Sequence, residues 1–175
     1  MCKKYELTDE VFEVIGFGNK LHRIKALRDF GDVKAGDLGG WIEKEYNLSH
    51  DGNAWVFNNA RVFGHARVYG DAEVLGGAWV FENARVFGHA MVYGNAVVCG
   101  DAEVFDHAKI HDSATVCDNA VVCGNTMVCG DAEVFDHAKI HDSAVVCGNA
   151  VVCGNTELSG YDNIHSGALI NQVEI

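Results

Sequence analysis

The chain has 175 residues, of which 49% are hydrophobic, and this is enough apolar material to pack one domain. Its formal net charge is −12, and residues 54–175 hold 5 Lys and Arg against 15 Asp and Glu, which argues against direct contact with nucleic acid or an anionic membrane. No apolar run approaches the ~18 residues that span a bilayer, and the N-terminal sequence MCKKYELTDE lacks the apolar core of an export signal. We therefore expect a cytoplasmic protein.

The first part of the chain differs from the rest and predicts a small N-terminal β cap. Residues Val11–Ile15 and Leu21–Leu27 flank the turn sequence GFGN, so they predict two strands joined in a hairpin. The sequence GDLGG at 36–40 predicts a second tight turn, because glycine accepts the positive φ angles of such turns. We accordingly divide the chain into a hairpin cap at 1–53 and a repeat domain at 54–175.

From Ala54 onward the chain reads as 20 consecutive units of six residues, without an insertion. The third position of every unit, from Val56 to Ile170, is Val, Ile or Leu, and the first position is Ala in 17 of the 20 units. Because alternate residues of a strand point to opposite sides, the first and third positions should face inward, and the second and fourth outward. The fifth and sixth positions are mostly Gly, Asn, Asp, His and Ser, which favour sharp corners. A helix fits poorly, because a period of six does not match 3.6 residues per turn.

The pattern Ala-x-Val-x-Gly-x over about 54–170 resembles the hexapeptide-repeat proteins. The resemblance implies an all-β fold, a single-stranded left-handed parallel β-helix in which three hexads form each 18-residue coil of a triangular solenoid. Twenty hexads then give about 6–7 coils. The left hand follows from the resemblance alone, since ordinary crossover connections favour the right. The chain departs from the enzymes of this family at the fourth position, where they often have a small or acidic residue and this chain has Phe, Tyr, Cys or His.

The stretch from LHRIKALRDF to NLSHDGNAWVF resembles the start of small, uninterrupted hexapeptide-repeat proteins of bacteria and their phages. Most of those have no assigned activity, so the resemblance favours a non-enzymatic protein, which would act in the host cytoplasm if a phage encodes it. Other members of the family are acyltransferases with a His general base and an acyl-CoA site beside a loop that interrupts the coils. No such loop interrupts 54–170, and nothing there would exclude water from a base. An oligomeric acyltransferase that uses acetyl-CoA is therefore the alternative.

Residues 18 apart should stack on the same face, and one of the three faces is largely apolar on its outside. Exposed apolar patches of this kind usually mark contacts between proteins. We expect the chain to form a homodimer or homotrimer through this face, although ladders of aromatic and thiol groups that only stabilise the coil are an alternative. The predicted interface residues are Phe63, Trp79, Phe81, Val97, Cys99, Cys117, Phe135, Val151 and Cys153.

Six of the seven cysteines occupy the outward fourth position. The pairs Cys99/Cys117 and Cys129/Cys147 should lie on adjacent coils within disulfide reach, but a reducing cytoplasm favours free thiols. Zinc sites usually show Cys-x-x-Cys or paired-His spacings, which the chain lacks. The sequence thus predicts no metal and no cofactor, with acetyl-CoA required only by the acyltransferase alternative.

Sixteen residues, CGDAEVFDHAKIHDSA, occur twice, at 99–114 and 129–144. The shift of 30 residues is five hexads, which is not a whole number of 18-residue coils. The two copies should therefore lie on different faces, which weakens a catalytic role for any repeated His.

Four acidic residues recur at intervals close to 18 residues along one expected corner: Glu82, Asp101, Asp118 and Asp136. Such a line of charge would imitate a phosphate backbone, whereas a solvated edge that aids solubility is the alternative. Our interpretation is a non-enzymatic, acidic binding or scaffold solenoid. Given the resemblance to phage proteins, we expect the partner to be a basic host or defence protein that binds nucleic acid. The solenoid would inhibit this partner. A structural, self-assembling solenoid is the third hypothesis.

Overall fold

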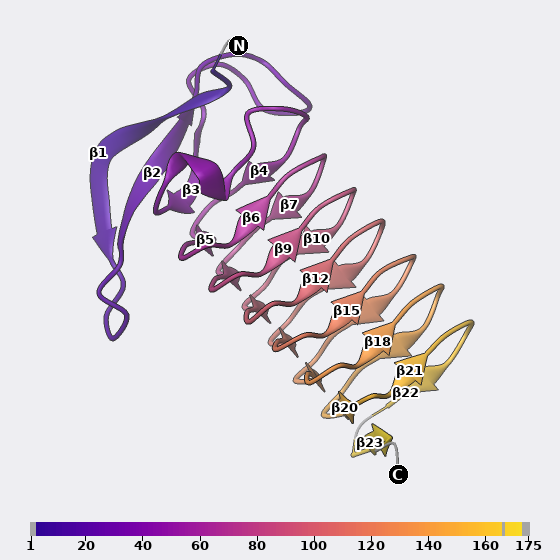
Figure 1. Cartoon of the computed structure of the whole chain (residues 1–175). Helices are drawn as coiled ribbons and strands as arrows, with labels where there is room; N and C mark the ends of the chain where they lie inside the picture. Colours follow the sequence, from indigo (N-terminus) through magenta and orange to yellow (C-terminus); the bar gives the residue numbers. More distant parts are fainter. Residues whose placement is uncertain (1–2, 166, 173–175) are drawn as a thin grey trace.

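The computed structural model describes residues 3–165 and 167–172 and shows an all-β parallel solenoid (Figure 1). In the described part, the regular elements are one short 3₁₀ helix, η1 (Glu45–Asn47), and strands, joined by turns and loops. Strands of the column belong in turn to three sheets, one on each side. This confirms the all-β solenoid that the hexad pattern predicts.

The three sheets have the following strands. The hairpin sheet contains, in spatial order, β1 (Tyr5–Glu13), β2 (Lys20–Ala26), β3 (Leu38–Ile42), β5 (Arg61–Val62), β8 (Trp79–Val80), β11 (Val97–Val98), β14 (Thr115–Val116), β17 (Glu133–Val134), β20 (Val151–Gly154) and β23 (Leu169–Gln172). The seven-stranded sheet contains β4 (Trp55–Val56), β7 (Glu73–Val74), β10 (Met91–Val92), β13 (Lys109–Ile110), β16 (Met127–Val128), β19 (Val145–Val146) and β22 (Asn163–Ile164). The six-stranded sheet contains β6 (Arg67–Val68), β9 (Arg85–Val86), β12 (Glu103–Val104), β15 (Val121–Val122), β18 (Lys139–Ile140) and β21 (Glu157–Leu158).

Strands that are 18 residues apart in sequence are direct neighbours in each of these sheets. Val97 of β11 pairs in parallel with Trp79 on one side and with Thr115 on the other. The coil therefore contains 18 residues, as predicted, and neighbouring coils are separated by the usual inter-strand distance of ~4.8 Å. Each outward side chain consequently stacks on the residue 18 positions away.

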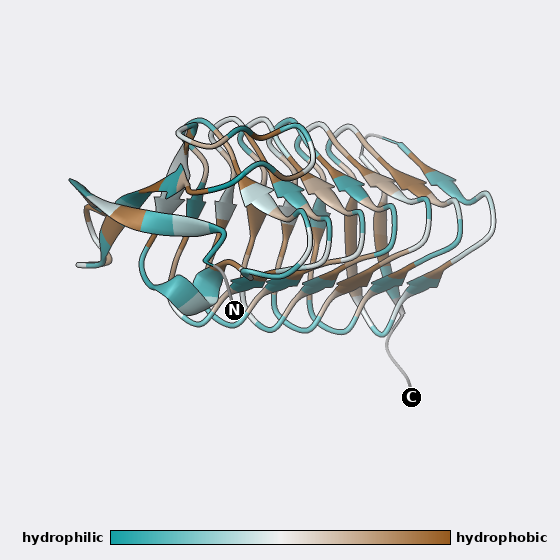
Figure 2. Ribbon diagram, turned by 90° about the horizontal axis from the view of Figure 1, so that it is seen from above, coloured by the Kyte–Doolittle hydropathy of each residue, from teal (hydrophilic) through white to brown (hydrophobic). Residues whose placement is uncertain are grey.

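A continuous aliphatic core fills the column. The third-position residues from Val56 to Val152 are at most 1% exposed, and each contributes about 1.5–3 kcal/mol by burial. Hydrophobic segments recur in coil after coil along the column, and hydrophilic colour appears at turns and on several strands (Figure 2). Burial decreases at the far end, where Leu158 is 7% exposed and Ile164 and Ile170 are only partly buried.

The corners depend on residues with positive φ at the fifth hexad position. Most are glycines, but Asp118 and Asp136 adopt φ angles of 58° and 59°. The side chains of these acidic residues accept a hydrogen bond from the backbone 18 residues later, as in Gly154 N to Asp136 Oδ2 (3.0 Å). The carboxylate thus satisfies a backbone N–H at the corner of the following coil.

The N-terminal segment contains a hairpin around the GFGN turn, but its first strand, β1, spans Tyr5–Glu13 and not the predicted Val11–Ile15. β1 pairs antiparallel with β2, and β2 with β3. The turn predicted over 36–40 is wrong in part, because Gly39 and Gly40 lie inside β3. A Cβ atom on Gly39 would lie 2.6 Å from the carbonyl oxygen of Val56, so glycine here allows close approach to the first coil. Parallel stacking already begins at β3, where Trp41 pairs with Arg61.

Two buried polar side chains close the N-terminal end of the column. Lys4 Nζ donates a hydrogen bond to Ala54 O (2.8 Å), and the Tyr5 hydroxyl donates to Leu48 O (2.8 Å). Burial lowers the pKa of Lys4 to about 8 and raises the pKa of Tyr5. Both side chains thus satisfy carbonyl groups that no further coil could reach.

Among the described residues, no helix is long and apolar enough to span a membrane.

Candidate binding surfaces

Three of the nine predicted interface residues lie beneath the chain's own hairpin. The ring of Phe17 is 5.5 Å from the rings of Phe63 and Phe81 and 6.2 Å from that of Trp79, measured between centroids. Phe63 is only 2% exposed. Arg61 extends this cluster, with its guanidinium 4.9 Å from the Trp79 ring. The part of the apolar face nearest the hairpin is therefore an intramolecular contact.

The remaining six predicted interface residues belong to β11, β14, β17 and β20 or directly follow these strands, which come after β8 in the hairpin sheet. We call their surface the apolar strip; it consists of Val97, Cys99, Cys117, Phe135, Val151 and Cys153. All except Cys153, which is 5% exposed, are partly accessible. The neighbouring thiol of Cys117, followed by burial, raises the pKa of Cys99. Glu133 of β17 is the charged side chain on this strip.

Glu82, Asp101, Asp118 and Asp136 lie along the corner that follows the hairpin-sheet strands and borders the apolar strip. Glu82 accepts a hydrogen bond from Gly100 N (2.6 Å), and Asp118 accepts one from Asp136 N (3.4 Å). Asp101, at the sixth hexad position, accepts one from Asn83 Nδ2 (2.9 Å). The hydrogen bonds of these carboxylates stabilise the corner. All four residues are exposed, so they also present negative charge to solvent.

A cleft of about 780 Å³ separates η1 from the six-stranded sheet. Its lining includes Arg67 and Arg85, which are direct neighbours on β6 and β9, together with Tyr46 and Tyr69. Arg85 forms an ion pair with Glu103 (3.0 Å). Two stacked arginines beside tyrosine rings can bind a phosphate or carboxylate. Sequence reasoning missed this cleft, because its wall at η1 is distant in sequence from the two strands.

One histidine, His50, lines this cleft, and it is poorly placed to act as a base. Its Nδ1 accepts a hydrogen bond from Lys4 N (3.2 Å), so the remaining ring proton sits on Nε2. Nε2 itself is buried, and the ring stacks on Tyr5 at 4.3 Å. Burial lowers the pKa of His50, which keeps the ring neutral. The cleft therefore presents cationic and aromatic groups without an accessible basic nitrogen from His50.

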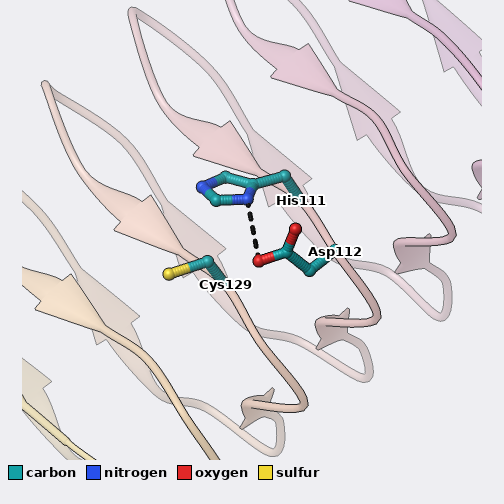
Figure 3. A group of neighbouring side chains, drawn as sticks. All are labelled: His111, Asp112 and Cys129. Carbon is teal, nitrogen blue, oxygen red and sulfur yellow. Dashed lines mark ion pairs between the residues drawn. The ribbon is translucent and has the colours of Figure 1, made fainter.

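A second constellation lies on the seven-stranded sheet. One possible ligand atom from each of His111, Asp112 and Cys129 lies within 4.8 Å of the other two (Figure 3). On the next coils, Cys147 Sγ is 2.9 Å from His165 Nδ1. The sequence-based expectation of no metal rested on spacing along the chain. That expectation did not weigh the imidazoles of His111 and His165, which flank Cys129 and Cys147 in the same column of stacked residues.

Comparisons with known proteins match parts of the chain. The family model of the YdcK beta solenoid repeat matches residues 84–100. The uncharacterized acetyltransferase YdcK of Escherichia coli (strain K12) is 40% identical over 62 residues, which cover 32% of this chain and 19% of that protein. The chain thus spans about a fifth of the length of this relative. Together with the stacked coils, these matches support a hexapeptide-repeat-like β-helix family.

Proposed function

We propose that this chain, a β-helix of the hexapeptide-repeat type, is a non-enzymatic binding and scaffold protein that associates with a second copy of itself through the apolar strip. One observation carries the proposal: the hairpin covers the nearer part of the apolar face, whereas Val97, Phe135 and Val151 stay accessible beyond it. Apolar surface of this kind favours a partner that removes it from water. A second copy related by a two-fold axis would bring two strips together.

The contrast with the six-stranded sheet supports this choice of face. At the outward second position that sheet has Arg67, Arg85, Glu103, Val121, Lys139 and Glu157, five of which are charged. The corresponding positions of the apolar strip, on β11, β14, β17 and β20, are Val97, Thr115, Glu133 and Val151. Charged side chains are depleted at the centre of protein interfaces, so the strip is the better surface for association.

Light scattering coupled to size-exclusion chromatography tests self-association. Val97→Glu and Val151→Glu place charge on the strip and should convert an oligomer to a monomer. Val121→Glu is the matched control, because it changes the same residue type at the same hexad position on the six-stranded sheet. A wild-type chain that elutes with monomer mass at every accessible concentration, or an oligomer that Val97→Glu and Val151→Glu leave intact, would contradict the proposal.

The acidic corner supports a second contact within the same proposed function, with a basic partner protein. Its charges would occupy a groove that otherwise accommodates a phosphate backbone, and would thereby inhibit that protein. A fluorescent oligolysine peptide is a defined probe for this contact. Binding at low salt should be lost in the double variant Asp118→Asn/Asp136→Asn. Asn retains an acceptor oxygen and tolerates positive φ, so the corner should stay folded.

Asp106→Asn/Asp142→Asn is the matched control for the acidic corner. Both residues occupy the fifth hexad position and have positive φ, but they lie at the corner that follows the six-stranded sheet. This variant should bind the peptide like the wild type. Equal losses in the two double variants would show that net charge alone attracts the peptide, and would remove the support for a specific corner.

An acyltransferase is the second candidate, and the arginine-lined cleft is the observation that favours it. The relative, of which the match covers 19%, is named an uncharacterized acetyltransferase, and Arg67 and Arg85 could hold the phosphates of acetyl-CoA. Calorimetric titration with acetyl-CoA separates the two candidates. The non-enzymatic proposal predicts no binding. Micromolar binding that is lost in Arg67→Gln and Arg85→Gln, but kept in Lys139→Gln, would favour the enzyme.

A further inference from the structure

Four sulfur and nitrogen ligands lie in one row on the outside of the seven-stranded sheet. His111, Cys129, Cys147 and His165 follow β13, β16, β19 and β22, each at the fourth position of its hexad. These strands pair in parallel and in register, so neighbouring side chains of the row lie on adjacent coils. The row therefore has the order imidazole, thiol, thiol, imidazole. Cys129 and Cys147 are free thiols and are partly accessible.

Contacts join the members of this row in pairs. Cys147 Sγ lies 2.9 Å from His165 Nδ1. At the other end, the ligand atoms of His111, Asp112 and Cys129 lie within 4.8 Å of one another, and His111 Nδ1 is 3.2 Å from Asp112 Oδ2 (Figure 3). Cys129 and Cys147 directly follow the paired strands β16 and β19, so the two thiols are neighbours in the row.

The other described outward cysteines lack this combination. On the hairpin sheet, the pair Cys99/Cys117 is flanked in its column by Phe81 and Phe135. On the six-stranded sheet, Cys123 has one imidazole neighbour, His141, whose ring nitrogens are 3.3 Å from Asp142 and 2.9 Å from Glu157. Within the described chain, two adjacent thiols with an imidazole at each end occur on the seven-stranded sheet alone.

We propose that the row of His111, Cys129, Cys147 and His165 binds a thiophilic metal ion such as Zn²⁺. The two thiolates are the central ligands, and the imidazole of His111 completes the protein's share of the set. His111 and His165 lie three coil steps of ~4.8 Å apart, so both rings cannot reach one ion. Thiolate and imidazole select Zn²⁺ and Cu⁺ over Mg²⁺ and Ca²⁺, which prefer oxygen. Asp112 acts as a positioning residue, because a carboxylate against the second ring nitrogen orients a metal-binding histidine.

The spacing of the coils suits an ion held between two thiolates. Neighbouring strands are ~4.8 Å apart, and two Zn–S bonds of ~2.3 Å at a tetrahedral angle place the sulfurs ~3.8 Å apart, so the two thiols must lean toward each other. A modest rotation of the two cysteine side chains then brings both sulfurs to the ion, without a change in the backbone. The ion would join adjacent coils from outside, where the column has no core residues.

Titration of the full-length, reduced protein with Co²⁺ provides a direct readout, because thiolate ligation produces a charge-transfer absorption in the near ultraviolet. We expect this band to saturate at one ion per chain and to be reversed by Zn²⁺. The double variant Cys129→Ser/Cys147→Ser should lose the band. Cys99→Ser/Cys117→Ser, which removes the matched thiol pair on the hairpin sheet, should retain it. Circular dichroism of all variants confirms that the coils are folded.

Two further measurements separate this row from adventitious thiol binding. Asp112→Asn keeps an acceptor for Gly130 N, which donates to Asp112 Oδ2 (3.1 Å), yet it should weaken Zn²⁺ affinity ~10–100-fold. Affinity should also rise as the pH is raised through neutrality, because binding releases thiol protons. Absence of the Co²⁺ band in the wild type, or its persistence in Cys129→Ser/Cys147→Ser, would overturn the proposal.

Discussion

From Asn58 to Gly160, the fifth residue of each hexad adopts a left-handed backbone conformation, and this residue is most often glycine or aspartate. Glycine does so without steric cost, as at Gly100, where a Cβ atom would lie 2.5 Å from Asp118 N. Aspartate does so with the help of its side chain, which bonds to the backbone one coil further on. The sequence pattern predicts the corner but not this bond, because its donor and acceptor are 18 residues apart.

Substitution of Asp136 separates the two contributions to a corner. Asp136→Ala retains the positive φ of 59° but loses the hydrogen bond to Gly154 N, so it should lower the free energy of unfolding by about 1–2 kcal/mol. Asp136→Asn keeps an acceptor and should change it by less than about 0.5 kcal/mol. Urea denaturation measures both. Asp131→Ala, outside the residues with positive φ, is the control, and a loss as large as that of Asp136→Ala would contradict the argument.

The buried ammonium of Lys4 predicts a pH dependence of stability. Burial lowers its pKa to about 8 from 10.5, so above about pH 8 the unfolded chain binds more protons at this residue than the folded chain. The contribution of Lys4 to stability should therefore rise from about pH 8 to about pH 10. The raised pKa values of thiols such as Cys129 should lower the stability as the pH rises. The informative quantity is therefore the difference in free energy of unfolding between the wild type and Lys4→Met.

Urea midpoints of the wild type and of Lys4→Met at three pH values between 7.5 and 9.5 provide this difference. The wild type should gain on the variant as the pH rises, by about 1–3 kcal/mol in all. If the difference in stability between the wild type and Lys4→Met stays the same at all three pH values, Lys4 has the same pKa in the folded and the unfolded chain, and the argument is contradicted.

At the level of elements, the hairpin is the least predictable part of the fold. The β propensity and the GFGN turn predict its strands, but nothing in the local pattern shows which face of the column it covers. The structure shows the covered face through contacts between distant residues: Phe17 lies against Phe63, and Val14 and Leu21 share a buried cluster with Phe63. As a result, the sequence-based interface of nine residues divides into a covered part and the apolar strip.

Placing a charge under the hairpin tests whether it shields the column. Val14 is 1% exposed, so Val14→Asp should detach the hairpin, because an unpaired carboxylate is not tolerated in an apolar contact. Fluorescence of Trp79 should shift to longer wavelength, and limited proteolysis should cut the hairpin first. Val11→Asp is the control, because Val11 is 53% exposed on the same strand region. Identical behaviour of the two variants would contradict the shielding role.

For the molecule as a whole, the hexad pattern predicts nearly all of the column, because one aliphatic residue in every six leaves a single inward side. It does not predict the row of His111, Cys129, Cys147 and His165 as a site, since each ligand arrives alone, one per coil. A solenoid of this kind is close to one-dimensional, and each coil contacts mainly its neighbours.

Stability should therefore depend on position along the column. Val104→Ala creates a cavity among fully buried core side chains and should lower the free energy of unfolding by about 2 kcal/mol. Ile164→Ala, near the far end, should lower it clearly less. Hydrogen exchange should show the greatest protection in the middle coils and rapid exchange around β22. Uniform protection along the column would indicate that the chain unfolds as one cooperative unit instead.

The repeated sequence CGDAEVFDHAKIHDSA shows how little the backbone distinguishes its three sides. Its first copy places Glu103 on the six-stranded sheet, and its second copy places the equivalent Glu133 on the hairpin sheet. Loss or gain of a single hexad would leave the core continuous but move every later hexad to the next of the three sides. Evolution could therefore realign thiols, charges and apolar groups against one another in one step, and create a new outer surface without a new fold.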